Sequence, residues 1–107
     1  MNTNKNTAIY LSLASALVLG SAQVYAQTNT NLGTGALNSN TTGAGNTAIG
    51  YDSLRFNTTG NYNTASGHQS LYSNTTGTGN TANGASSLDS NTTGYSNTAS
   101  GRTSLYF

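Results

Sequence analysis

The feature that most constrains this chain is a strict repeat of 17 residues. The tetrapeptide Asn-Thr-Thr-Gly begins at Asn40, Asn57, Asn74 and Asn91. Ten of the 17 positions carry the same residue in all four copies, in the pattern N-T-T-G-x-x-N-T-A-x-G-x-x-S-L-x-x. A fixed register is required when every copy must lie directly on the previous one, and it is not typical of low-complexity disorder. We number the repeat positions from 1 at Asn40 to 17 at Phe56.

Residues 1–26 are typical of a secretory signal peptide. Lys5 supplies a positive charge, and residues 8–19 form an apolar run that is shorter than the roughly 20 residues needed to cross a bilayer. Small residues near the end of this segment predict cleavage between Ala26 and Gln27. The alternatives are an uncleaved N-terminal anchor and a buried core helix. The signal peptide predicts an exported protein that is extracellular or displayed on the cell surface. No later segment is apolar enough to predict membrane insertion.

The repeats predict an all-β fold, a parallel β-solenoid with one 17-residue coil per repeat. Residues 40–107 hold four complete copies, and residues 27–39 form a lead-in with a decayed half-repeat. Each copy is too short for two helices and a turn, and its glycines and threonines disfavour a helix. We expect two short extended segments per coil, with corners at Gly43 and Gly50 and their equivalents. Successive coils would lie about 4.8 Å apart.

Two repeat positions are apolar in every complete copy, and we predict that both point into the coil or into a contact between chains. A buried Ala48 would place Thr47 and Ile49 on the opposite face of its strand. The recurring asparagines and threonines are expected to stack as ladders, although they could instead serve only as turn formers. This small core favours several chains packed side by side as a homo-oligomer. The predicted core residues are Leu37, Leu54, Leu71, Leu88, Leu105, Ala48, Ala65, Ala82 and Ala99.

The segment Asn46-Thr47-Ala48-Ile49-Gly50, followed by Ser53-Leu54, resembles the head repeats of trimeric autotransporter adhesins, the YadA-like head. Similar repeats occur in phage tail-fibre-like proteins. The resemblance covers residues 29–107 and implies a left-handed parallel β-roll, a homotrimer, and binding of host matrix proteins or cell-surface ligands. Those adhesins continue into a stalk and an outer-membrane anchor, and neither pattern occurs here. We therefore expect a fragment of a longer anchored adhesin or a secreted remnant.

The charged residues are too few and too scattered for most other functions. They make up 5% of the chain, against about 25% in an ordinary globular protein. After residue 26 two arginines balance two aspartates, so nucleic-acid binding is not expected. Asp52 and Asp89 occupy different repeat positions and His68 stands alone, which disfavours acid–base catalysis and a metal site. We expect no enzyme activity and no cofactor.

Tyrosines in the variable positions are the candidate ligand surface, because tyrosine combines a large area with a polar tip. They could equally fill the seams between coils or chains. The leading function is an adhesin head; the alternatives are an architectural fibre segment and an ice-binding solenoid that uses the paired threonines at positions 2 and 3. The candidate ligand residues are Tyr51, Tyr62, Tyr72, Tyr95 and Tyr106.

Overall fold

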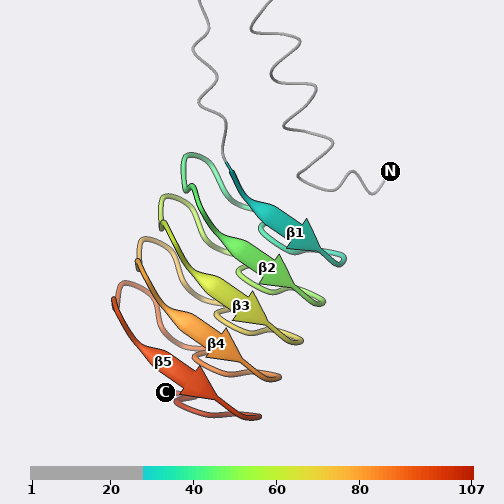
Figure 1. Cartoon of the computed structure of the whole chain (residues 1–107), viewed down its shortest axis with the longest axis vertical. Coiled ribbons are helices and arrows are strands. Elements are labelled where there is room, and N and C mark those ends of the chain that lie inside the picture. Colours follow the sequence, from blue (N-terminus) through green and yellow to red (C-terminus); the bar gives the residue numbers. More distant parts are fainter. Residues whose placement is uncertain (1–27) are drawn as a thin grey trace, which may run out of the picture.

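The computed structural model describes residues 28–107 as a parallel β-solenoid in which each repeat forms one coil (Figure 1). The predicted signal peptide and its cleavage site at Ala26 and Gln27 lie outside the described residues. No residue of this part of the chain is helical. One sheet holds the strands in chain order, and they are β1 Thr30–Leu32, β2 Thr47–Ile49, β3 Thr64–Ser66, β4 Thr81–Asn83 and β5 Thr98–Ser100.

The strands pair in the register that the repeat predicts. Ala48 of β2 lies opposite Ala65 of β3, and each later pair of strands is offset by the same 17 residues. The half-repeat belongs to the same array, since Asn31 of β1 lies opposite Ala48. We call the turns of the solenoid coils 1 to 5, with coil 1 at residues 28–39 and one repeat in each later coil. The predicted parallel β-solenoid is therefore confirmed.

The second wall of each coil differs from the expectation of two extended segments. Each coil has a single three-residue strand, and the opposite wall is a chain of turns through repeat positions 11 to 17. Along this wall φ is positive at alternate positions, for example 124° at Gly50, 56° at Asp52 and 49° at Leu54. The wall is still bonded like a sheet, because Leu54 N–H donates to Ser70 O and Asp52 N–H donates to Thr34 O.

At the Asn-Thr-Thr-Gly corner, several backbone N–H groups donate to one carbonyl oxygen of the next coil. The N–H groups of Thr41, Thr42 and Gly43 all donate to the carbonyl oxygen of Thr58 in the next coil, at 2.9, 3.1 and 3.2 Å. Three successive N–H groups directed at one oxygen form a concave site of the kind that binds anions elsewhere. Gly43 lies at an expected corner, but unlike Gly50 it does not have a positive φ. Glycine is needed there because a Cβ would clash with Gly60 O in the next coil.

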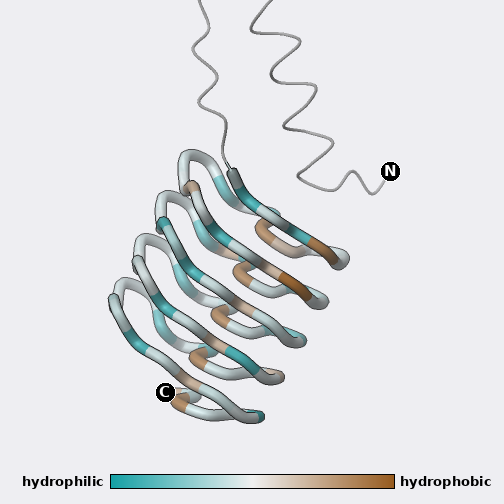
Figure 2. The backbone as a smooth tube through the Cα atoms, in the orientation of Figure 1, coloured by the Kyte–Doolittle hydropathy of each residue, from teal (hydrophilic) through white to brown (hydrophobic). Residues whose placement is uncertain are grey.

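The interior of the solenoid is a narrow apolar column that runs through all coils. In Figure 2 brown recurs at the same place on the turn wall of successive coils. The prediction that Leu105 is a core residue is wrong, because it is 54% exposed in coil 5, whose outer side no described coil covers. Asn31 replaces alanine in coil 1, is 1% exposed, and its Oδ1 has no hydrogen-bond partner. The buried apolar residues are Ala36, Leu37, Ala48, Leu54, Ala65, Leu71, Ala82, Leu88 and Ala99.

Two asparagine ladders flank the apolar column, which confirms the ladders rather than a role in turns alone. At repeat position 1, Asn57 Nδ2 donates to Asn40 Oδ1 at 2.8 Å and to Gly60 O at 3.0 Å. At position 7, Asn63 Nδ2 donates to Asn46 Oδ1 and to Gly77 O. Asn57 and Asn63 are fully buried. These amides satisfy carbonyl groups that a narrow coil would otherwise leave without partners.

Candidate binding surface

The constant and the variable repeat positions divide cleanly between the inside and the outside of the coil. In the middle coils the constant asparagine, alanine, serine and leucine positions are buried. The exposed large side chains occupy variable positions instead, with Leu105 as the exception. Because the constant residues hold successive coils together, the variable residues can change without loss of the stacking. The surface of the solenoid is therefore where sequence differences between coils are displayed.

The five candidate tyrosines do not form one patch. Tyr62 and Tyr95 lie at repeat positions 6 and 5, on the corner that precedes the strands. Tyr51 lies at position 12, just past the corner that follows the strands, whereas Tyr72 and Tyr106 lie at position 16 near the end of the turn wall. Tyr62 and Tyr95 are the most exposed of the five, at 71% and 76%.

Two of the tyrosines fill seams between coils. The ring of Tyr51 stacks on His68 of the next coil, with centroids 5.5 Å apart and planes at 10°. Tyr72 packs edge-on against Phe56 of the preceding coil at 5.0 Å. Such aromatic pairs stabilise a fold by about 0.5–1.5 kcal/mol beyond their buried area. These rings therefore contribute to stacking as well as to the outer surface.

The remaining tyrosines have different neighbours. Tyr106 contacts Phe107, the next residue, at a centroid separation of 5.2 Å. Among residues 28–107, Tyr62 and Tyr95 pair with no other aromatic ring. Tyr62 lies instead over Gly45 of the preceding coil, where an added Cβ would come within 2.6 Å of the ring carbon Cδ1. The ring is thus held on one side by backbone and open to solvent on the other.

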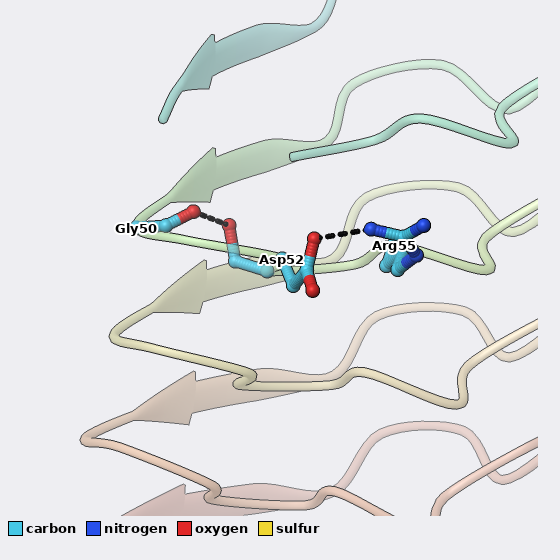
Figure 3. A network of polar contacts seen from close by, with 4 residues as sticks. Gly50, Asp52 and Arg55 are labelled. Carbon is cyan, nitrogen blue, oxygen red and sulfur yellow. Dashed lines mark hydrogen bonds and ion pairs between the residues drawn. The ribbon is translucent and has the colours of Figure 1, made fainter. Parts of the chain in front are cut away.

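An ion pair lies on the turn wall of coil 2 (Figure 3). Arg55 Nη1 donates to Asp52 Oδ1 at 2.6 Å, and Ser53 Oγ donates to Gly50 O at 3.1 Å. The hydrogen bond that Arg55 donates to Asp52, and next the negative charge of Asp52, raise the pKa of Arg55 above its usual value. The carboxylate is 8% exposed and rests against Gly35 of coil 1, where no Cβ would fit. This pair neutralises the charge of Asp52 at the seam between coils 1 and 2, while the side chain of Arg55 stays 34% exposed.

The outer face of the sheet is uncharged and carries one threonine column. Ala48 is fully buried, and Ile49 beside it is 41% exposed, as the alternation predicts. Leu32 lies opposite Ile49 in β1 and is 57% exposed, so coils 1 and 2 present a small apolar patch. Figure 2 shows the same two strands as the brown ones. The column at repeat position 8 consists of Thr30, Thr47, Thr64, Thr81 and Thr98.

The paired threonines considered for ice binding differ in their hydroxyl partners. The hydroxyls of Thr41, Thr58 and Thr75 at position 2 each donate to the position 2 carbonyl of the next coil, at 3.0 to 3.1 Å. The neighbouring position 3 threonines are all exposed. Position 2 is thus half-buried in the middle coils, at Thr58 and Thr75, whereas position 3 is exposed in coils 2 to 5.

Within the described part of the chain, no three His, Cys, Asp or Glu side chains come together as a metal site would require. The same residues contain no helix of the length and apolarity that a membrane span needs. Asp52 and Asp89 both lie on the turn wall, but in different coils and at different repeat positions. Comparisons with protein-family models, with curated proteins and with solved structures found no match.

Sequence reasoning missed the different environments of the tyrosines. Tyr51, Tyr62 and Tyr72 contact a residue at the same or a nearby repeat position one coil away, namely His68, Gly45 and Phe56. Comparing the variable residues that lie 17 positions apart in the sequence would have shown that Tyr62 lies against Gly45 of the preceding coil. The absence of charge at positions 3 to 6 in every copy was also visible in the sequence.

Proposed function

We propose that this chain is the head segment of an exported surface adhesin, resembling the YadA-like head. It is a structural and binding module that attaches cells to other cells or to host matrix, and it needs no cofactor. The observation that supports the proposal is that the constant and the variable positions of the repeat have different roles. Constant residues are used for stacking, while aromatic and apolar side chains at variable positions are displayed outward. A rigid solenoid with a varied surface suits recognition over an extended area.

We further propose that three copies associate side by side through the outer face of the sheet. Leu32 and Ile49 are exposed there, no charged residue lies on the strands, and the column inside one coil offers little apolar area. Burying these side chains between chains would stabilise the assembly. Light scattering of the purified protein coupled to gel filtration is expected to give three times the chain mass. The double variant Leu32→Thr, Ile49→Thr should dissociate, and a monomeric wild-type protein would contradict the proposal.

Adhesion is tested by coating beads with the purified protein and measuring their retention on collagen, on fibronectin and on cultured cells. Saturable retention is expected on at least one of these surfaces. Gly67→Ala, which disrupts stacking in the middle of the solenoid, should abolish it, because the displayed residues then lose their spacing. Beads that bind no surface above an albumin-coated control would leave an architectural segment as the better description.

Ice binding is a second candidate, favoured by the threonine column on the sheet. Four of its five members are exposed, and the parallel register repeats their methyl and hydroxyl groups at the coil spacing. The neighbouring outward column is irregular, because it holds leucine, isoleucine, serine and asparagine. Thermal hysteresis measured on the purified protein decides between the two functions. Hysteresis that Thr64→Leu abolishes would support ice binding, and its absence would exclude it.

A further inference from the structure

The corner that precedes the strands carries two largely exposed aromatic rings that stack on no other ring of residues 28–107. Tyr62 and Tyr95 are 71% and 76% exposed, and the ring contacts of residues 28–107 involve neither. Leaving a large apolar ring in water is unfavourable, and exposed aromatic residues of this kind often mark binding sites. We call this corner, repeat positions 3 to 6 of coils 2 to 5, the tyrosine edge.

Tyr62 is held in place by the fold. Its ring lies on Gly45 of the preceding coil, and a Cβ there would come within 2.6 Å of Cδ1 and 2.8 Å of Cε1. Its backbone N–H donates to Ala44 O at 2.9 Å, and the residue itself has a φ of 56°. Gly45 therefore lies close to the Cδ1–Cε1 edge of the ring, while most of the ring is exposed to solvent. This arrangement preorganises the ring for stacking, which reduces the entropy lost when a ligand binds.

The tyrosine edge contains no charged residue. Its four coils hold only threonine, glycine, alanine, asparagine, tyrosine and serine at these positions. The charged residues of the repeats lie elsewhere, at repeat positions 12, 13 and 16, so neither a polyanion nor a polycation finds a partner here. Thr76 and Thr93 are exposed beside the tyrosines and offer hydroxyl groups. An uncharged ligand that has both C–H faces and hydroxyl groups fits this chemistry.

The spacing of the two tyrosines narrows the ligand class. Tyr62 belongs to coil 3 and Tyr95 to coil 5, so they lie two coils apart, roughly 9.6 Å along the axis from the usual strand spacing. This separation is close to the length of a disaccharide unit in an extended polysaccharide. Sugar rings present C–H groups that stack on the electron-rich face of an aromatic ring. A protein partner would need about 800 Å² on each side, far more than two rings supply.

We propose that Tyr62 and Tyr95 are two stacking positions for an extended, uncharged polysaccharide that lies along the tyrosine edge. The inference rests on the proposed binding function and names its ligand class. Thr76, Thr78 and Gly79 lie between the two rings along the chain and leave the intervening coil without a bulky side chain. Every second sugar would stack on a tyrosine while hydroxyl groups between them bond to threonine and water.

The proposal is tested by titrating the purified full chain with cellohexaose and following the tyrosine ring signals by NMR. Saturable shifts are expected for Tyr62 and Tyr95, and maltohexaose, which has the same sugars in a curved chain, should bind at least about tenfold more weakly. Tyr62→Ala and Tyr95→Ala should each raise the Kd about tenfold, which corresponds to 1.4 kcal/mol. Tyr51→Ala, on another part of the coil, should leave the Kd unchanged.

Two glycine variants separate stacking from folding. Gly45→Ala would push the ring of Tyr62 out of place, whereas Gly101→Ala lies off the tyrosine edge, at a φ of 115°, and its Cβ would meet nothing within 4 Å. Both variants place alanine at a positive φ, so only Gly45→Ala should weaken cellohexaose binding.

Three outcomes would overturn the polysaccharide proposal. These are no saturable shift with cellohexaose, equal binding of maltohexaose, and equal losses in the two glycine variants. Loss of bead retention on collagen in Tyr62→Ala, without any cellohexaose binding, would assign the tyrosine edge to a protein partner. The adhesion proposal would then be supported, and the proposal of a polysaccharide ligand would be wrong.

Discussion

At the scale of single residues, the buried asparagines bond each coil to its neighbours on both sides. Asn63 is fully buried and has partners on both sides. Its N–H and Nδ2 donate to Asn46 Oδ1, and its own Oδ1 accepts from Asn80 N–H and Nδ2. A side-chain amide can do this because it carries both donors and acceptors. Serine or threonine could not make the same set of bonds.

Replacing Asn63 with alanine is expected to lower the free energy of unfolding by about 2 kcal/mol. The change leaves Asn80 N–H without a partner in a buried place, which costs about 1–3 kcal/mol, and it removes one of the two donors to Gly77 O, which keeps Asn74 Nδ2. Asn97 is the matched control, since it has the same repeat position but is partly exposed in coil 5. Asn97→Ala should cost less than about 1 kcal/mol. Urea denaturation measures both, and equal losses would contradict the ladder's role.

Because of Asp89, the stability of the protein is expected to depend weakly on pH in the acidic range. Burial raises the pKa of its carboxyl above the ordinary value of 3.8. The folded state therefore binds the proton more readily than the unfolded chain, and stability falls as pH rises from 3.8 through the raised pKa. The effect should not exceed about 0.5 kcal/mol, because the residue is partly exposed. Thermal unfolding of Asp89→Asn should show a flatter pH profile, whereas Ser90→Asn should match the wild type.

At the scale of the coil, the contrast between the two walls shows what could be predicted from the sequence. The strand wall follows from the alternation around Ala48 and from the 17-residue register. The turn wall could not be predicted, because leucine rarely adopts positive φ and Leu54 and Leu71 do so at 49° and 50°. Their burial and the bonds to neighbouring coils outweigh that local cost. Because the stabilising contacts are made between coils, the residue type alone does not indicate that these leucines adopt a positive φ.

Alanine substitutions at the corner glycines test how closely neighbouring coils must approach each other. Gly67 has a φ of 138°, and a Cβ there would lie 2.6 Å from the carbonyl carbon of Gly84. Gly101 has a comparable φ of 115°, but its Cβ would meet nothing within 4 Å. Both alanine variants carry backbone strain of about 1–3 kcal/mol, and only Gly67→Ala adds the clash. We expect Gly67→Ala to be less stable than Gly101→Ala by at least about 2 kcal/mol in urea denaturation. Similar stabilities would mean that the coils can separate locally at little cost.

At the scale of the whole molecule, residues 28–107 are held together coil by coil. Each of their strands contacts only the strands one repeat before and after it, and the Asn–Asn bonds of the ladders join adjacent coils. Its stability should therefore be close to a sum over coils and over the interfaces between them. The binding surface obeys the same rule. Tyr62 and Tyr95 keep their two-coil separation only while all intervening coils stay in register.

The register itself gives the sharpest test of this architecture. A second copy of residues 57–73 inserted after Ser73 adds a coil whose asparagine, alanine and leucine side chains continue every column. The protein should gain stability, and the urea m-value, which scales with the surface exposed on unfolding, should rise by about one fifth as five coils become six. The same insertion shortened by Gly60 contributes nearly the same composition but shifts every later column by one position. Outward side chains would then face the core, so this variant should lose the cooperative transition that the 17-residue insertion strengthens. If both insertions unfolded alike, direct stacking of equivalent residues would not be what stabilises the chain.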